Sequence, residues 1–165
     1  MTLSFTTSRL NVVEVDAHMP SDERAQLLAC VPQILTPTVV AALPPYFHDV
    51  NSLAAAEVWL EQMLAQSRLL RVQTNVNEVI GFLFIHMADN VAHIGYVLGQ
   101  ASWGKGLATE LLQGLMIEAR KTPWHKLVGG VDQGNLASTK LLKKLGFVAQ
   151  EADDNGVIMF EYVLP

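Results

Sequence analysis

The sequence predicts an α+β fold with a mixed, mostly antiparallel central sheet flanked by helices. Strand-like segments over 68–75, 78–89 and 91–100 are separated only by the turns "NVNE" and "DN", and turns this short force antiparallel pairing. A long helical segment then leads to another strand at 126–133, and such a crossover makes its two strands parallel. The 165 residues, half of them hydrophobic, fit one domain over 1–165.

The N-terminal part is expected to begin with a strand over 9–16, where apolar and polar residues alternate. A helix over 22–31 follows, with Ser21 as its N-cap. The stretch 35–50 holds three prolines and is expected to be irregular apart from one short helical piece.

A second helix is predicted over 52–66, with Asn51 as its cap. Apolar residues recur along it at helical spacing and define the face that it buries. That face consists of Leu53, Ala56, Leu60 and either Met63 or Leu64.

The C-terminal part continues with a long helix, a strand, a short helix and a hairpin. The long helix is expected from Trp103 to about Lys121, and a capped helix over 135–147 ends at Gly146. The "DDNG" sequence between 147–153 and 157–164 is a strong hairpin signal. The buried side of the long helix is expected to contain Leu107, Leu111, Leu112, Leu115, Met116 and Ile117.

Composition argues against several classes of protein. The net charge of −5 disfavours general nucleic-acid binding, and no apolar run is long enough for a membrane span. Cys30 is the only cysteine, so it forms no internal disulfide and no four-cysteine zinc site, and we expect it in the core. No metal is expected. The N-terminus does not resemble a secretory signal, and a reducing cytoplasm is the simplest setting.

Charge is distributed unevenly along the chain. Residues 103–147 carry seven basic and three acidic side chains, a net charge of +4, so the remainder carries −9. One part of the molecule therefore suits an anion and the rest a cation.

The stretch "ASWGKGLATE", residues 101–110, is a glycine-rich turn that opens a helix and is typical of a phosphate site. Gly99, Gly104 and Lys105 fit the start of a P-loop, but Gly106 stands where the magnesium-binding hydroxyl is needed. Thr109 stands where a dinucleotide fingerprint needs its third glycine. A strand end, a glycine turn and a helix N-terminus fit instead the pyrophosphate turn of an acyl-CoA-dependent transferase.

This stretch resembles the acetyl-CoA motif of the GNAT N-acetyltransferases, (Gln/Arg)-x-x-Gly-x-(Gly/Ala). Gly106 and Ala108 match it, whereas Trp103 departs at the first place. The opening "WGKG", the strand "IGYVL" at 94–98 and the segment "NLASTKLLKKLGF" at 135–147 are similar to the branch of ribosomal-protein N-terminal acetyltransferases (RimJ/RimL-like). "SRLNV" matches how such chains begin.

The resemblance implies acetyl-CoA as co-substrate, with its pantetheine arm between the strand 91–98 and the strand 126–133. A backbone N–H near Val97 or Leu98 would then stabilise the oxyanion formed on the thioester. The implied cofactor-binding residues are Val97, Leu98, Gly99, Trp103, Gly104, Lys105, Gly106, Leu107, Ala108, Thr109, Asn135 and Ser138.

His93 is the first candidate for the base that deprotonates the attacking amine, because imidazole titrates close to neutral pH. Alternation places it on one face with Gly95 and Val97. The alternatives are an ordinary surface or core histidine, a water relay, and three weaker candidate bases. Those candidates are His86, Glu57 and Glu61.

The proton donor for the leaving thiolate is harder to assign. The family's tyrosine falls at Leu142 here, which leaves Ser138 and Tyr96 as the catalytic hydroxyls. Asn135 is expected to cap its helix or to contact pantetheine. Lysines of the same helix either face solvent or meet the 3′-phosphate of CoA, and these are Lys140, Lys143 and Lys144.

The predicted activity is acetyl transfer from acetyl-CoA to a primary amine, a protein N-terminus or a small molecule, by direct attack in a ternary complex. Residues 1–66 hold two basic and seven acidic side chains, and 148–165 hold four acidic and none basic, which suits a cationic acceptor. The chain is expected to be a monomer or a homodimer. The alternative is a non-catalytic acyl-CoA-binding regulatory module, which Leu142 keeps open.

Overall fold

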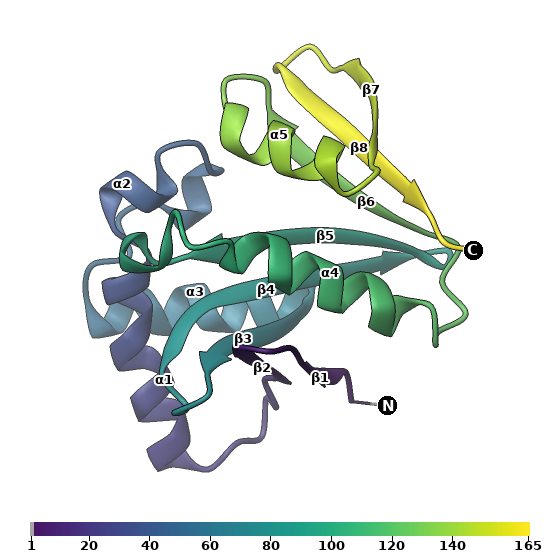
Figure 1. The fold of residues 1–165 in the computed structure, drawn as a ribbon. Coiled ribbons are helices and arrows are strands. Elements are labelled where there is room, and N and C mark those ends of the chain that lie inside the picture. Colours follow the sequence, from purple (N-terminus) through teal and green to yellow (C-terminus); the bar gives the residue numbers. More distant parts are fainter. Residues whose placement is uncertain (1) are drawn as a thin grey trace.

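A computed structural model describes residues 2–165 and confirms the α+β class, with one sheet flanked by helices (Figure 1). Across these residues the eight strands lie in the order β1-β2-β3-β4-β5-β6-β8-β7. The strands are β1 (Ser4–Thr6), β2 (Leu10–Glu14), β3 (Arg68–Thr74), β4 (Val79–Ala88), β5 (Val91–Leu98), β6 (Lys126–Asp132), β7 (Val148–Ala152) and β8 (Val157–Val163). The helices are α1 (Ser21–Ile34), α2 (Pro37–Val40), η1 (Pro45–Phe47), α3 (Leu53–Gln66), η2 (Gln100–Ser102), α4 (Leu107–Ala119) and α5 (Leu136–Lys144).

The meander was predicted correctly. β3 pairs antiparallel with β4, and β4 with β5. Asp89 and Asn90, which join β4 to β5, both have positive φ, at 51° and 63°. Two consecutive left-handed residues are the geometry of the tight hairpin turn that matches strand twist, and Asp and Asn tolerate it.

The N-terminal predictions need three corrections. β1 was missed, because a strand of three residues is too short to show a period. Helix α1 starts at Ser21 itself, with Pro20 rather than Ser21 as its N-cap and no side-chain cap. The cap of α3 is Ser52, whose hydroxyl accepts from the Ala55 N–H at 3.1 Å, and not Asn51.

The buried face of α3 also differs from the expected one. Leu53 is 62% exposed, because it opens the helix beyond the edge of the core, whereas Trp59 is buried. Helix α4 likewise begins at Leu107, four residues after the predicted Trp103, since the glycine turn that follows η2 occupies the intervening chain. Ile117, predicted to be buried, is 56% exposed, and Ala119 takes its place in the core.

The two faces of the sheet carry separate apolar clusters. Leu111 and Leu115 of α4 and Leu142 of α5 pack on one face, whereas Leu60 of α3 and Val31 of α1 pack on the other. Strand β5 serves both clusters, because Ile94 and Leu98 belong to the first and Val97 to the second. Alternate side chains of β5 are therefore directed to opposite faces of the sheet.

Strands β5 and β6 form the predicted parallel pair, and their pairing is short. It runs from Val91–Lys126 to Ile94–Gly129 and then stops. Beyond it the two strands diverge (Figure 1), β5 continuing along β4 and β6 along β8. We call Gly95–Leu98 and Gly130–Asp132 the splayed ends, which expose unpaired strand edges to each other.

Gly81 of β4 lies where the sheet has no room for a side chain. A Cβ at this position would approach the carbonyl oxygen of Val97 to 2.2 Å and Leu98 Cδ2 to 2.7 Å. We expect Gly81→Ala to lower the free energy of unfolding by about 1–3 kcal/mol, because the backbone of β5 must move. Urea denaturation measures it.

The matched control for that substitution is Gly95→Ala in the adjacent strand. A Cβ at Gly95 would touch only Phe84 Cδ2, at 3.7 Å, which is ordinary van der Waals contact. Equal stability losses in the two variants would contradict the steric argument.

Among the described residues, no helix is long and apolar enough to cross a membrane.

Candidate functional site

The glycine turn before α4 adopts a backbone that only glycine enters without strain. Gly104 and Gly106 have φ of 72° and 75°, and Gly106 is the N-cap of α4. No atom lies within 4 Å of the Cβ position of Gly104, so the turn is open on that side. A ligand can therefore approach the backbone closely here.

Three backbone N–H groups of the first turn of α4 precede the first helical hydrogen bond. That bond joins the Glu110 N–H to the Gly106 carbonyl at 3.1 Å. The N–H groups of Leu107, Ala108 and Thr109 therefore have no acceptor within the helix. Together with the positive end of the helix dipole they form an arrangement suited to an anion.

Trp103, the residue that departs from the family motif, ties the turn to β5. Its indole N–H donates to the Leu98 carbonyl at 2.9 Å, although the side chain is 46% exposed. The indole thus anchors the start of the turn to a splayed end. This contact was not predictable from the sequence, because the motif assigns a different residue type to the position.

The backbone of the splayed end of β5 presents alternate donors. The Gly99 N–H donates to Ile80 on β4 at 2.8 Å, and the register then places Val97 opposite Phe82. Since consecutive N–H groups of a strand point to opposite sides, the Val97 N–H is directed at β4 and the Leu98 N–H at the β6 side. Of the two candidate oxyanion donors, the Leu98 N–H is therefore the one that points toward the side of β6.

The two hydroxyls that were predicted to be catalytic lie within hydrogen-bonding distance of each other. Tyr96 Oη on β5 and Ser138 Oγ on α5 lie 3.0 Å apart. Burial raises the pKa of Tyr96, and the hydrogen bond with Ser138 offsets only part of that rise. The phenol therefore stays protonated at neutral pH, and either hydroxyl can be the donor in the bond that joins them.

Asn135 caps α5. Its side-chain oxygen accepts from the Ser138 N–H at 3.2 Å, which is the predicted structural role. Leu142, at the position of the family's tyrosine, is buried beside Gly129. The three lysines of α5 are exposed, and these are Lys140, Lys143 and Lys144.

His93 lies on the face of the sheet that α1 and α3 cover, on the same side of β5 as Val97. His86 is its partner across β4–β5, with ring centroids 6.2 Å apart, and His86 Nδ1 lies 2.9 Å from the Gln66 carbonyl. On the β6 side the register pairs His93 with Val128.

The weaker candidates, Glu57 and Glu61, lie on α3 beside Arg24, at 3.5 and 3.7 Å from its guanidinium. Cys30 is half-buried against the cluster on the α1–α3 face, and burial raises the pKa of its thiol.

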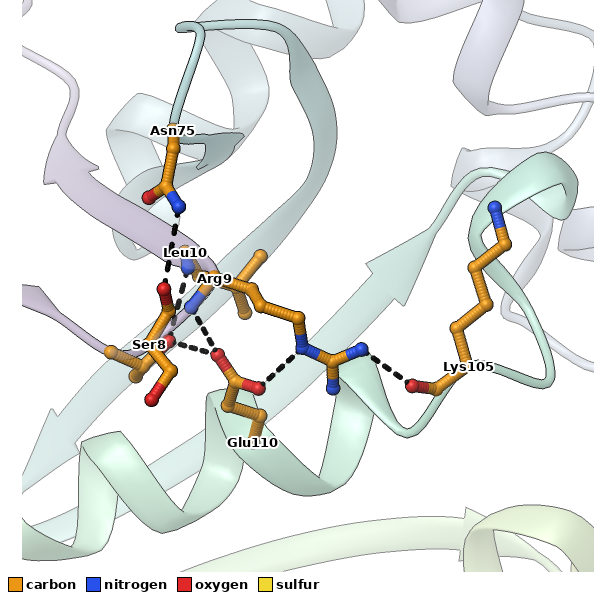
Figure 2. A network of polar contacts seen from close by, with 7 residues as sticks. Ser8, Arg9, Leu10, Asn75, Lys105 and Glu110 are labelled. Carbon is orange, nitrogen blue, oxygen red and sulfur yellow. Dashed lines mark hydrogen bonds and ion pairs between the residues drawn. The ribbon is translucent and has the colours of Figure 1, made fainter.

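Sequence reasoning missed a polar network that joins the β1–β2 turn to α4 (Figure 2). Arg9 donates to Glu110 through its backbone N–H and through Nε, both at 2.8 Å, and its Nη1 donates to the Lys105 carbonyl at 2.9 Å. Thr7 Oγ1 donates to the same carboxylate. Arg9 and Gly106 also line an open groove of about 700 Å³ between residues 4–9 and α4.

Glu110 is held as a carboxylate by this network. Partial burial alone raises its pKa, but hydrogen bonds from Thr7 and Arg9 outweigh burial, so the pKa lies below its ordinary value. The resulting ion pair with Arg9 places no net charge beside the first turn of α4.

Among residues 2–165 no three His, Cys, Asp or Glu side chains gather in a way that would hold a metal ion.

Solved structures that share this fold include acetyltransferases. Spermidine N-acetyltransferase from Vibrio cholerae, in complex with CoA and spermine, matches with a TM-score of 0.75 at 14% identity, covering 95% of this chain and 96% of that one. RimL, the ribosomal L7/L12 alpha-N-protein acetyltransferase, in complex with coenzyme A, matches with a TM-score of 0.73 at 18% identity, covering 98% of both chains. At these identities the likeness establishes the fold.

The family follows from the sequence match. A model described as "Acetyltransferase (GNAT) domain" matches residues 20–148, and the chain belongs to the GNAT acetyltransferase family. L-methionine sulfoximine/L-methionine sulfone acetyltransferases of Pseudomonas paraeruginosa and Pseudomonas aeruginosa are each 32% identical over 103 residues, or 58% of this chain. That match spans 59% of the length of these relatives.

Proposed function

We propose that the chain is an acetyl-CoA-dependent amine N-acetyltransferase that acts as one domain over 1–165. The observation that carries this proposal is the end of the β5–β6 pairing at Ile94–Gly129, followed along the chain by the splayed end of β5, by η2, and then by the glycine turn and the N-terminus of α4. One extended ligand with a pyrophosphate at one end and amides along its length fits both features.

The residues present suit that ligand. The N–H groups of Leu107, Ala108 and Thr109 would receive the pyrophosphate, and the splayed ends would pair with the pantetheine amides as an added strand does. Acetyl-CoA supplies the acetyl group as a thioester. The Leu98 N–H would donate to the thioester oxygen and so stabilise the charge that develops on it.

Acetyl transfer forms a C–N bond, breaks the C–S bond and moves one proton from nitrogen to sulfur. We propose His93 as the acceptor of the amine proton, directly or through water, because it lies on β5 next to the splayed end. The pair Tyr96–Ser138 would return a proton to the sulfur.

The proposed acceptor is a primary amine. The relatives and neighbours act, by their names, on an amino acid derivative, a polyamine and a protein N-terminus, and each of these carries an amine. Helices α1 and α3 carry four acidic side chains against one basic residue, Arg24, which pairs with two of them, and this net negative charge favours a cationic acceptor. Membership of the ribosomal-protein N-terminal branch is one form of this proposal.

A thiol-release assay tests the function. Purified protein with acetyl-CoA is given L-methionine sulfone, spermidine or a peptide with a free N-terminus, and we expect acetyl-CoA-dependent release of CoA with at least one of them. Mass spectrometry must show the acetyl group on nitrogen. CoA binding without turnover on any amine would favour the regulatory-module alternative.

Tyr96→Phe is expected to lower kcat by roughly threefold to tenfold and to leave the KM for acetyl-CoA unchanged. The effect is modest because a thiol, with an ordinary pKa near 8.5, leaves readily without a full proton transfer. Steady-state kinetics measures it. Ser138→Ala should act similarly, and the double variant should be no slower than either single variant, because the two hydroxyls would act as one hydrogen-bonded proton relay.

The same tyrosine has a second readout in alkaline stability. Because the pKa of Tyr96 is raised in the folded chain, its stabilising neutral form is fully present below the ordinary tyrosine pKa of about 10 and is lost as the pH rises above it. Tyr96→Phe should therefore flatten the fall of stability at alkaline pH. For the kinetic prediction, a double variant whose loss of kcat equals the product of the two single losses would contradict a shared proton relay through Tyr96 and Ser138.

A further inference from the structure

The polar network around Arg9 takes no part in the proposed chemistry, but it bonds to the glycine turn before α4, on which cofactor binding would depend (Figure 2). Four of its hydrogen bonds converge on Glu110 and Lys105 from the β1–β2 turn. The turn is itself rigid, because Thr7 and Leu10 bond each other through two separate hydrogen bonds. The Ser8 carbonyl also accepts from Asn75 Nδ2 at 3.3 Å.

The bond from Arg9 Nη1 to the Lys105 carbonyl orients a whole peptide unit. In a planar trans peptide the Lys105 C=O and the Gly106 N–H point in opposite directions. With its carbonyl held by Arg9 at 2.9 Å, this unit directs the Gly106 N–H away from Arg9. Gly106 tolerates either sign of φ, so without the bond the peptide could turn over and present its carbonyl oxygen in place of its N–H.

The ion pair with Glu110 has a separate, electrostatic effect. Glu110 lies in the first turn of α4, where a carboxylate favours the helix but repels a phosphate bound at the same end. Arg9 bonds that carboxylate through two N–H groups and neutralises it. The positive end of the helix dipole and the Lys105 ammonium group then attract an anion, with no repulsion from an unpaired Glu110.

We propose that Arg9 is a positioning residue for the phosphate-binding turn, which aims the Gly106 N–H and cancels the charge of Glu110. This inference rests on the proposed binding of acetyl-CoA. Arg9 acts through Lys105, Gly106 and Glu110, and its effect is confined to ligands that carry phosphate. Lysine cannot replace it fully, because one ammonium group does not reproduce the planar fork that spans both acceptors.

The test compares CoA with pantetheine, which lacks the phosphates, by titration calorimetry on the full chain. Arg9→Met should weaken CoA binding about tenfold or more, since a charge-assisted hydrogen bond is lost and Glu110 is left unpaired. Pantetheine binding should be unchanged. Arg9→Lys should fall between the wild type and Arg9→Met.

Glu110 provides a second, independent arm. Glu110→Gln in the Arg9→Met background should recover part of the lost CoA affinity, because the repelling carboxylate is gone. In steady-state kinetics Arg9→Met should raise the KM for acetyl-CoA and leave kcat and the KM for the amine unchanged. A merely structural role would change all three.

The matched control is Arg68→Met. Arg68 also bonds a carboxylate with two nitrogens, at 3.0 and 2.6 Å, but its partner Glu14 belongs to β2 and not to α4. This variant should lose thermal stability and keep its CoA affinity. Circular dichroism checks that both variants are folded.

The outcomes separate the two proposals. If the wild type binds CoA and Arg9→Met binds it equally well, or if Arg9→Met loses CoA and pantetheine to the same extent, the positioning role is overturned and the proposed function stands. If the wild type does not bind CoA, the proposed function is overturned, and so is the positioning role that rests on it.

Discussion

Gly106→Val is expected to abolish CoA binding while the chain remains folded. Gly106 has a φ of 75°, a left-handed conformation that costs a β-branched residue at least about 1–2 kcal/mol. Relief of that strain requires the turn to leave this conformation, and the N–H groups of Leu107 and Ala108 then lose their common direction. The Cβ position also lies 3.6 Å from Arg9 Nη2, so the methyl groups of valine would push Arg9 from the Lys105 carbonyl.

Calorimetric titration with CoA measures the loss, and we expect at least a hundredfold weaker binding, or about 2.8 kcal/mol. The control is Gly146→Val, which places the same residue at another left-handed glycine, with φ of 97°, after α5. That variant should be less stable than the wild type and should bind CoA normally. Unchanged CoA affinity in Gly106→Val would refute the assignment of 103–109 as a pyrophosphate turn.

Much of the fold was predictable because it rests on local signals. Asp89 and Asn90 specify a tight turn, which predicts the antiparallel pairing of β4 with β5. The chain from β5 to β6 is long and contains a helix, as a crossover connection requires, which predicts the parallel pair. Helix boundaries were less predictable. The turn from Trp103 to Gly106 contains residues that a helix also accepts, and only the positive φ values of its glycines delay α4 to Leu107.

The candidate site was predictable where it lies within one segment. The turn 103–109 came from a contiguous motif, and Asn135 from its position before a helix. Contacts between distant segments did not follow in the same way. Arg9 and Glu110 are 101 positions apart, and nothing in the composition of either segment indicates that they meet. Tyr96 and Ser138 were each predicted to supply a catalytic hydroxyl, but the 3.0 Å distance between their oxygens depends on how α5 packs over β5.

The short β5–β6 ladder determines where the candidate site lies. Pairing stops at Ile94–Gly129 because β6 follows β8, with which it pairs over its whole length, while β5 follows β4. Each splayed end therefore has a partner on its outer edge only. An extended ligand that completes both inner edges satisfies backbone groups that would otherwise depend on water.

His93→Ala is expected to lower kcat/KM by about 10²-fold at pH 6.5–7, with a smaller loss as the pH rises. The amine must lose a proton to attack, and the proposed acceptor lies on β5, one residue before the pairing with β6 ends. At higher pH more of the amine is already neutral and hydroxide is more abundant, so a positioned base matters less. The pH–rate profile of the variant should therefore be steeper on its acid side.

His86→Ala is the matched control, because His86 lies opposite His93 on β4 and shares its face of the sheet. Lys126 on β6 and Glu161 on β8 also lie on this face, bond each other at 2.8 Å and remain in both variants. If His93 is the base, His86→Ala keeps a wild-type profile and His93→Ala does not. Coincident profiles for His93→Ala and the wild type would assign the proton transfer to water, and the reverse pattern would assign it to His86.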